Sequence, residues 1–427
     1  MRLKNGSHRM SGTTDEGPNV NELENPLRSV LVVSDFACIN GGGAKVAIDG
    51  ARLAAEAGLE VTFFAPVGPV APELTHPNIT VVCLDQSDIL HAKSRVKAAL
   101  QGIWNAEAVR ALSEVMDTLD PATTVMHVHS YVKAISPAIG PVLARGALKN
   151  VFTMHDYFLA CPNGGFYDYQ KDEICTRRAM GVSCLTTQCD VRKASHKAWR
   201  VVRQAISQTA GALPRGLKHI IYISEFQKNI MAPYLPTGCG LYHVPNPVEV
   251  SPDPKGDPRH SDRFLFIGRL NPEKGAVLFA QAAQMAGVQA VFVGDGQDRD
   301  KVLAANPSAQ ILGWKSPAEV QELIKTARCV VFASLWPEPL GLVPLEAIHL
   351  GVPVIAGRWT AACETVDHDR TGLLVETPDA EAFAAAIKDL CEDTHPVFER
   401  IKTYVPSYTP EAHQKALFDT YTQVLQS

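Results

Sequence analysis

The sequence predicts an α/β protein in which two domains are each built around a parallel β-sheet. Strand-like apolar runs alternate with helical patterns along almost the whole chain, which is typical of parallel sheets covered by helices on both faces. The length of 427 residues exceeds what a single core accommodates. A polar, proline-rich segment separates the two halves, as an interdomain linker would.

The first half contains strand-like runs rich in valine, isoleucine and aromatic residues, at 30–34, 60–64, 79–84, 124–128, 151–154 and 220–223. Helical periodicity separates most of them, for example at 44–57 and 106–119. These alternating units predict one parallel sheet with its own helices.

The second half repeats the pattern, with strand-like runs at 264–267, 290–293, 330–333 and 353–356 and a helix at 276–285. Ser316 and Glu319 have the spacing of a capping box around Pro317, which predicts the start of another helix. Thr409 and Pro410 predict a final helix that runs to about residue 425.

The domain boundaries follow from the prolines. Five prolines within 244–258 cannot occupy a central strand or the interior of a helix. We therefore expect a disordered leader, an N-terminal domain, a C-terminal domain and a final helix, at 1–27, 28–247, 248–408 and 409–427.

The composition argues against several classes of protein. A net charge of −5 disfavours a dedicated nucleic-acid binder, which is usually basic over a whole domain. No apolar run approaches the ~18–20 residues of a membrane span. The polar leader lacks the apolar middle region of a signal peptide, so we expect a cytoplasmic protein.

Charged residues with complementary chemistry follow two strands of the second half. Arg269 and Lys274 come after the first strand of this half. Glu338 and Glu346 flank a loop-to-helix transition after a later strand. Open α/β sheets bind ligands at the carboxyl ends of their strands. Cations suit a diphosphate and carboxylates accept hydrogen bonds from sugar hydroxyls, so the four residues predict a site for a nucleotide-activated sugar.

The chain resembles the GT-B glycosyltransferases, specifically the large retaining family four (group 1). The matching motifs occur in the family's order and spacing: Gly268-Arg269 with Lys274, the turn 293–296, the segment 312–314, the Glu-x7-Glu element of Glu338 and Glu346, and the segment 351–354. The resemblance runs from about residue 28 to the end of the chain. It implies two Rossmann-like domains that face each other across a cleft, with the C-terminal helix crossing back to the first domain. The N-terminal domain would lie on the acceptor side, and the C-terminal domain would bind the nucleotide sugar.

The resemblance assigns the phosphate site. Arg269 and Lys274, after Gly268, would neutralise the donor diphosphate, since guanidinium binds oxyanions bidentately and lysine adds a mobile charge. Free N–H groups of a helix that follows Gly341 and begins near Leu342 would assist them. By position alone, the two cations could equally be surface charges at the end of a sheet.

The resemblance also assigns the sugar site. Glu346 would bind the ribose hydroxyls, and Glu338 would hold donor-sugar hydroxyls near the reacting carbon. The glycine-rich loop with Gly42 and Gly43 would let the backbone approach the donor phosphates and the acceptor. His155, at the end of a strand, would contact the donor sugar; without the family its usual interpretation is a structural histidine. His127 and His129, at a neighbouring strand end, are candidates for a supporting role.

One loop departs from the family pattern. Thr360 and Ala361 replace a glycine pair that the family often has, while Arg358 and Trp359 add bulk and Glu364 is kept. Because this loop shapes the donor pocket, the sugar cannot be inferred by analogy.

These observations predict a metal-independent, hexosyltransferase-like enzyme that moves a sugar from a nucleotide-diphosphate sugar to a hydroxyl acceptor with retention. No acidic Asp-x-Asp motif is placed to hold Mg²⁺, so we expect Arg269, Lys274 and the helix N-terminus to stabilise the leaving group without a cofactor. The family implies a glycan or lipid-linked acceptor in bacterial cell-surface polysaccharide or glycolipid synthesis. A GT-B sugar-nucleotide epimerase and a non-catalytic nucleotide-sugar-binding protein are the alternatives.

A basic segment in the first half bears on the acceptor. Residues 191–224 contain no Asp or Glu but carry Trp199 and the cations Arg192, Lys193, Lys197, Arg200, Arg203, Arg215 and Lys218. One interpretation is a solvated helix face. The other is a surface for anionic lipid headgroups or a lipid-diphosphate acceptor, with peripheral association at the inner face of the plasma membrane.

The last pattern is a group of four cysteines, Cys161, Cys175, Cys184 and Cys189. Cytoplasmic thiols stay reduced, so grouped cysteines suggest metal, and four thiolates would satisfy structural zinc. Their spacing lacks the paired Cys-x2-Cys knuckles of a zinc site. Unligated or redox-labile thiols and an iron–sulfur cluster are therefore alternatives.

Overall fold

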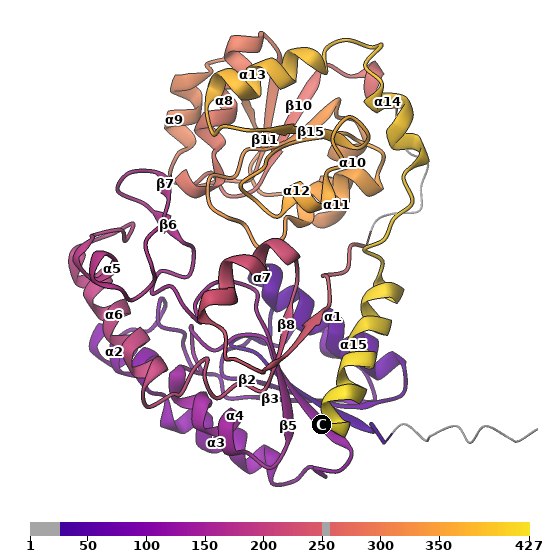
Figure 1. The fold of residues 1–427 in the computed structure, drawn as a ribbon. Coiled ribbons are helices and arrows are strands. Elements are labelled where there is room, and N and C mark those ends of the chain that lie inside the picture. The colour runs from indigo at the N-terminus through magenta and orange to yellow at the C-terminus, as the bar shows by residue number, and fades with distance from the viewer. Residues whose placement is uncertain (1–25, 250–256) are drawn as a thin grey trace, which may run out of the picture.

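The structure, a computed structural model, describes residues 26–249 and 257–427 and contains two α/β domains, stacked one above the other in Figure 1. Residues 1–25 of the expected leader and 250–256 of the expected linker lie outside the described residues. Leu27, which the sequence assigned to the leader, is instead buried in the core of the first domain.

The N-terminal sheet has seven parallel strands in the order β3-β2-β1-β4-β5-β8-β9. Their bounds are β1 Ser29–Val33, β2 Glu60–Ala65, β3 Ile79–Cys83, β4 Thr124–Val128, β5 Lys149–Thr153, β8 His219–Tyr222 and β9 Gly240–His243. The helices of this half are α1 Gly42–Glu56, α2 Arg95–Ile103, α3 Ala106–Met116, α4 Gly140–Arg145, α5 Val182–Thr186, α6 Ala194–Gln208 and α7 Glu225–Met231. A small antiparallel hairpin, β6 Tyr167–Asp168 with β7 Glu173–Ile174, projects from the loop after β5.

The C-terminal sheet has six parallel strands in the order β12-β11-β10-β13-β14-β15. Their bounds are β10 Arg263–Ile267, β11 Gln289–Val293, β12 Gln310–Ile311, β13 Cys329–Phe332, β14 Val354–Gly357 and β15 Gly372–Val375. The helices are α8 Ala276–Ala286, α9 Arg299–Ala305, α10 Pro317–Lys325, α11 Leu342–His349, α12 Ala362–Thr365, α13 Ala380–Asp389, α14 Val397–Arg400 and α15 Pro410–Gln426. The predicted capping box at Ser316 and Glu319 is present at the start of α10.

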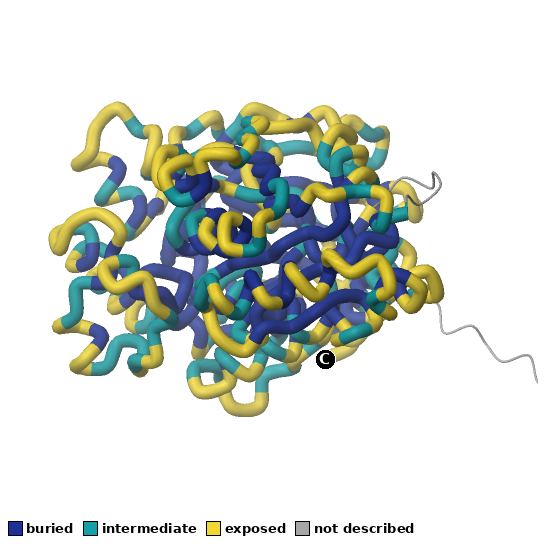
Figure 2. Tube along the Cα trace, turned by 90° about the horizontal axis from the view of Figure 1, so that it is seen from above, coloured by how far each residue is buried: buried dark blue, intermediate teal, exposed yellow. Residues whose placement is uncertain are grey.

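Apolar clusters cover both faces of each sheet, which is why the central strands are apolar without alternation. All five residues of β4 are buried, for example. Seen from above, the buried segments run through the middle of the molecule and the exposed loops surround them (Figure 2). The expected two-domain α/β architecture is confirmed.

The last helix, α15, belongs to the C-terminal part of the chain but packs on the N-terminal sheet (Figure 1). Its side chains Leu417, Tyr421 and Val424 are buried in the core shared with α1. Where the chain crosses between the domains, the N–H of Val248 donates to the carbonyl of Tyr408 at 2.8 Å. The two crossing segments are therefore paired.

The strand orders determine which loops lie beside each other at the carboxyl ends of the strands. In the N-terminal sheet the order reverses direction between β1 and β4, and in the C-terminal sheet between β10 and β13. Such switch points leave a crevice at the carboxyl ends of the strands. The glycine-rich loop follows β1, and the segments with Lys274 and Glu338 follow β10 and β13.

Candidate active site

A pocket of about 300 Å³ lies between the two domains. Seven of the predicted site residues line it: Gly42, Gly43, His155, Gly268, Lys274, Glu338 and Leu342. The remaining predicted residues Arg269, Gly341 and Glu346 do not. The volume is at the lower end of the range of about 300–1,000 Å³ for small-molecule sites.

Lys274 and Glu338 form an ion pair in this pocket. Nζ of Lys274 lies 2.8 Å from Oε1 of Glu338, and both side chains are mostly buried. The other carboxylate oxygen, Oε2, accepts hydrogen bonds from Oγ of Ser334 at 2.9 Å and Nε1 of Trp336 at 3.2 Å. Three donors therefore hold the carboxylate of Glu338 in one orientation.

Ser334 and Trp336 were not singled out from the sequence. The only signal was their position between β13 and Glu338. A third lining residue missed by the sequence is Asn246, in the crossing segment. Its side chain is buried, and among the described residues its Oδ1 has no hydrogen-bond partner. A buried acceptor that faces a pocket without a partner is an indication of a ligand.

The loop that departs from the family pattern donates two hydrogen bonds to the segment that carries Glu338. Nε1 of Trp359 donates to the carbonyl of Ser334 at 2.8 Å, and the N–H of Ala361 donates to the carbonyl of Glu338 at 3.0 Å. The bulky Trp359 therefore positions the segment that carries the site.

Helix α11 points its N-terminus towards the pocket. Its N-cap residue, Gly341, supplies no side-chain cap, and Leu342 lines the pocket. Uncapped N–H groups carry partial positive charge, which suits a phosphate. A Cβ atom on Gly42 would lie 3.8 Å from Cδ1 of Leu342, so the glycine-rich loop of one domain faces α11 of the other.

Gly43 leaves little room for a larger residue because His155 approaches it closely. A Cβ atom on Gly43 would lie 3.1 Å from Cγ of His155, which is tighter than nine in ten real contacts of this kind. The imidazole ring therefore lies directly against the backbone of the loop.

His155, which is partly buried, starts a chain of histidines that continues into the core. Nε2 of His155 lies 2.9 Å from Nδ1 of His129, and the rings of His129 and His127 are 3.9 Å apart between centroids. His127 in turn hydrogen-bonds to the hydroxyls of Thr153 at 2.6 Å and Tyr421 at 2.7 Å. His127 and His129 thus connect the pocket to the returning helix α15.

These histidines are neutral at neutral pH. Burial lowers the pKa of His155 to about 4, and repulsion from His413 adds to the effect. Burial also lowers the pKa values of His127 and His129 well below the ordinary value. His155 can therefore exchange hydrogen bonds with a sugar but supplies no charge for a phosphate.

Glu346 lies one turn into α11 and is partly buried. Burial raises its pKa to about 7, and the positive charge of Lys45 from the other domain offsets part of that rise. The side chain has no hydrogen-bond or ion-pair partner within the described ranges. A carboxylate in this state gains from hydroxyl donors, as a ribose would provide.

Arg269 is placed apart from Lys274. Its side chain is exposed and lines a neighbouring cavity, although Gly268 beside it lines the pocket. The expectation that both cations face one diphosphate stays a prediction.

A carboxylate of the C-terminal domain binds the start of a helix in the N-terminal domain. Glu364 accepts the N–H of Glu225 at 3.0 Å and also the N–H of Phe226, at the first turn of α7. Close by, Oγ of Ser224 donates to the carbonyl of Pro339 at 2.5 Å. The two domains are therefore in direct polar contact beside the pocket.

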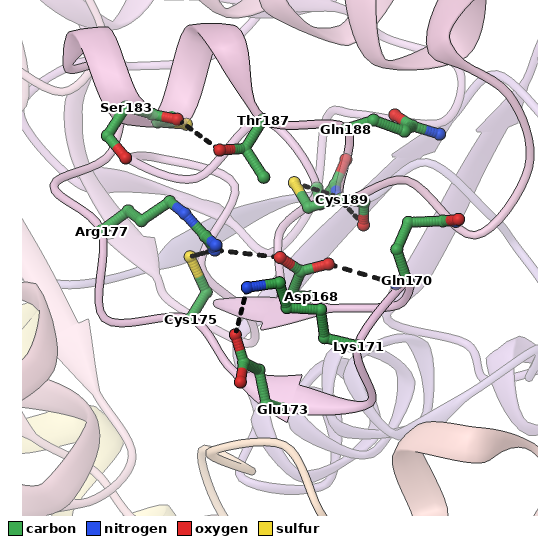
Figure 3. Close-up of polar contacts among 12 residues, drawn as sticks. Asp168, Gln170, Lys171, Glu173, Cys175, Arg177, Ser183, Thr187, Gln188 and Cys189 are labelled. Carbon is green, nitrogen blue, oxygen red and sulfur yellow. Dashed lines mark hydrogen bonds and ion pairs between the residues drawn. The ribbon is translucent and has the colours of Figure 1, made fainter.

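Two of the four grouped cysteines contact a buried lysine. Nζ of Lys197 is 3.1 Å from the sulfur of Cys189 and 3.6 Å from that of Cys184. Figure 3 shows Arg177 reaching both the Asp168 carboxylate, at 3.0 Å, and the Cys175 sulfur, at 3.6 Å. Cationic side chains therefore occupy positions next to these sulfurs.

Zinc at Cys161, Cys175, Cys184 and Cys189 stays a prediction. In the part of the chain that the structure describes, no three or more Cys, His, Asp or Glu side chains are grouped as metal ligands. All four cysteines are free thiols. Any zinc site here would require the side chains to rearrange and Lys197 to move away.

The basic segment 191–224 is not simply a charged surface. For Lys197 and Arg203 that expectation is wrong, because both side chains are buried. Arg200 is half-buried and pairs with Asp190 at 2.8 Å. In the described residues, no helix has the length and apolar character needed to cross a membrane.

Comparison with known proteins agrees with this architecture. Residues 249–406 match the family profile described as "Glycosyl transferases group 1". One curated relative is the lipopolysaccharide core biosynthesis glycosyltransferase LpsE of Rhizobium meliloti, 27% identical over 40% of this chain and 51% of its own length. Another is the GDP-mannose-dependent alpha-(1-6)-phosphatidylinositol monomannoside mannosyltransferase of Mycolicibacterium smegmatis, 27% identical over 41% of this chain and 53% of its own length. The chain thus spans about half the length of these relatives.

Solved structures extend the likeness to both domains. Sucrose-phosphate synthase from Thermosynechococcus elongatus superposes with a TM-score of 0.66 at 18% identity, over 93% of this chain and 99% of that one. Anabaena Alr3699/HepE in complex with UDP superposes with a TM-score of 0.62 at 17% identity, over 93% and 100%. At these identities the likeness concerns the fold. The chain therefore has the two-domain GT-B fold, and its residues 249–406 are similar to the glycosyl transferases group 1 family.

Proposed function

We propose that the protein is a retaining glycosyltransferase of family four that moves a sugar from a nucleotide-diphosphate sugar to a hydroxyl of a glycan or lipid-linked acceptor. The observation that carries the proposal is the Lys274–Glu338 ion pair in a pocket between the domains, beside the uncapped N-terminus of α11. This arrangement offers positive charge for a diphosphate and a carboxylate for sugar hydroxyls.

In the proposed reaction the donor diphosphate lies against Lys274 and the first N–H groups of α11. As the bond from the anomeric carbon to the phosphate oxygen breaks, negative charge develops on the leaving diphosphate. Preorganised cations and N–H groups stabilise that charge without reorganisation. Arg269 approaches the same charge from the border of the pocket, and no metal ion is required by the proposal.

Glu338 and His155 position the sugar. The three hydrogen bonds to Glu338 fix its oxygens, and the ring of neutral His155 lies against the backbone of Gly43. Attack by the acceptor hydroxyl on the same face as the leaving phosphate retains the configuration, and the departing phosphate takes the acceptor proton. Glu346, on α11, accepts hydrogen bonds from the ribose.

The biological setting is also a proposal. Relatives are described as acting on lipopolysaccharide core and on phosphatidylinositol mannosides. We infer a role in bacterial cell-surface polysaccharide or glycolipid synthesis, at the cytoplasmic side of the membrane with peripheral attachment.

A panel of nucleotide sugars tests the function. The true donor should raise Tm in a thermal-shift assay, and Lys274→Ala should remove that shift. Product analysis with the labelled donor should then give an α- or β-glycoside with the configuration of the donor. An epimerised nucleotide sugar would support the epimerase instead, and binding without turnover on any acceptor preparation would support a non-catalytic protein.

A further inference from the structure

A second cavity, of about 590 Å³, adjoins the donor pocket. Most of its wall comes from α2, α6 and the loops after β3 and β4 in the N-terminal domain. Arg269 and Glu273 close it from the C-terminal domain. Because Gly268 lines the donor pocket and Arg269 lines this cavity, the two spaces meet at adjacent residues.

The cavity is strongly cationic. Its lining includes one carboxylate, Glu273, and six cations: Arg95, Lys133, Arg192, Arg200, Arg203 and Arg269. Of these cations, Arg200 has the only ion pair recorded in the described parts of the chain, with Asp190 at 2.8 Å. Six cations against one carboxylate, five of them without an ion pair in the described residues, leave a positive potential in this space.

Arg203 is the deepest of them. Only 4% of its surface is exposed, and its guanidinium lies 4.9 Å from the ring centroid of Trp199 and 5.2 Å from that of Phe158. Its NH1 donates to the carbonyl of Val132 at 3.2 Å. Burial lowers its pKa to about 10, with repulsion from Arg200 second. A buried guanidinium held against aromatic faces without a carboxylate is costly unless an anion binds it.

The nearby carboxylates do not neutralise the cavity. Asp35 is fully buried and accepts the N–H groups of residues 133–135, each at 2.9 Å. Oδ1 of Asp156 accepts the N–H of Phe158 at 2.9 Å. Within the described residues, neither carboxylate forms an ion pair with a cation of the cavity, and Asp35 instead fixes the backbone of Lys133, which lines the cavity.

We propose that this cavity binds a phosphate or diphosphate group carried by the acceptor substrate. The inference rests on the proposed transferase function and adds the chemical class of the acceptor. One guanidinium group can bind two oxygens of a phosphate at once. The cavity supplies several guanidinium groups at the edge of the donor pocket. Trp199, Phe158 and the small residues Ala98 and Ala99 of α2 provide an apolar wall for the group next to the phosphate.

The phosphate could belong to a lipid carrier or to a soluble sugar phosphate. The outer face of α2 favours the lipid, because Val96 and Leu100 are 71% and 64% exposed one turn apart. These side chains would contact the apolar surface from which a lipid-linked phosphate enters.

The test measures binding of inorganic pyrophosphate to the full-length protein by calorimetry. The donor pocket is first saturated with the nucleoside diphosphate of the donor that the thermal-shift panel identifies. We expect saturable binding that weakens as salt is added. Arg192→Gln and Lys133→Gln should each weaken it about 10-fold, as expected for one charge-assisted hydrogen bond. Neither side chain forms an ion pair within the described residues, so both variants should fold. Lys193→Gln, which removes the exposed neighbouring charge outside the cavity, is the matched control and should not change the affinity.

Two failures can be told apart. If no nucleotide sugar or nucleoside diphosphate of the panel binds, the proposed transferase function fails. If the nucleoside diphosphate binds but pyrophosphate does not bind at up to about 10 mM, or if the three variants behave alike, the anion site is refuted and the transferase function stands. In a second arm, farnesyl diphosphate and glucose 1-phosphate compete with pyrophosphate. Stronger competition by the first indicates a lipid carrier and by the second a soluble phosphate, while competition by neither contradicts the proposal.

Discussion

Replacing Glu338 by glutamine isolates the charge of the carboxylate while it keeps the shape of the side chain. At 2.8 Å from Nζ of Lys274, and with an effective dielectric constant of about 20, the gross Coulombic attraction is about 6 kcal/mol, most of which desolvation offsets. An amide has one acceptor oxygen where the carboxylate has two. If that oxygen faces Lys274, the new NH₂ group faces the indole N–H of Trp336, which cannot rotate away.

We therefore expect Glu338→Gln to lose about 1–2 kcal/mol of stability, because one buried donor is left without an acceptor. For a domain of this size that lowers Tm by about 2–8 °C. The effect on turnover should be larger. Misplacing Lys274 and the donor sugar together should lower kcat by about 10²–10³, while the affinity for UDP changes less than about three-fold.

The assay combines steady-state kinetics with the donor found by thermal shift, calorimetric titration with UDP, and a melting curve. Glu376→Gln is a suitable control, since Glu376 also pairs with an arginine at 2.5 Å but is exposed on the same domain. Turnover of Glu338→Gln within a few-fold of the parent would refute the assigned role. A large loss of UDP affinity would mean that Glu338 acts on the nucleotide instead.

Four further outcomes are expected. Lys274→Ala and Arg269→Ala should each lower kcat/KM by at least about 10², and the double variant should be less damaging than their product if both act on one diphosphate; full additivity would contradict that. Activity should survive EDTA, and strict dependence on added Mg²⁺ would overturn this expectation. The folded-state pKa of Glu346, raised to about 7 from 4.5, means that the folded protein retains a proton which the unfolded chain has lost, so stability should fall by about 3 kcal/mol as pH rises from 4.5 to 7. Glu346→Gln should flatten that slope in denaturant titrations, and an unchanged slope would place the titration elsewhere. Elemental analysis of protein purified without a metal-affinity step tests the cysteine group, and less than about 0.2 zinc per chain would rule out structural zinc.

Buried parallel strands were the easiest elements to predict, because their apolar character does not depend on neighbours distant in sequence. The strands of the two main sheets that sequence patterns did not identify, β9, β12 and β15, all lie at sheet edges. β9 has half of its residues exposed, β12 is two residues long, and β15 is buried but only four residues long. Such strands form because they pair with a neighbouring strand, and their own residues give little indication of that pairing.

The candidate site likewise contains residues that could be predicted from the sequence and residues that could not. Lys274, Glu338 and the start of α11 occur in motifs with fixed spacing, and the structure brings them to one pocket. The contacts that hold them come from residues without a motif, such as Ser334 and Trp359. The burial of Arg203 was not predicted either. From its place on α6 the sequence suggests a solvated arginine. Its guanidinium instead packs against Trp199 of the same helix and against Phe158 of the loop after β5, and the sequence alone does not indicate the second contact.

The two hydrogen bonds that the Glu364 carboxylate accepts at the first turn of α7 indicate how much free energy is needed to separate the domains there. Opening the domains would exchange its two N–H partners for water, at a cost of about 1–3 kcal/mol for charge-assisted hydrogen bonds of this kind. A micromolar ligand contributes about 8 kcal/mol, so a donor that contacts both domains can readily shift the balance between open and closed forms. In the proposed reaction, the diphosphate product would have lost its sugar contacts after transfer and would hold the domains together less strongly. The strength of the Glu364 contact would then influence how fast the spent nucleotide leaves and how often the proposed reaction turns over.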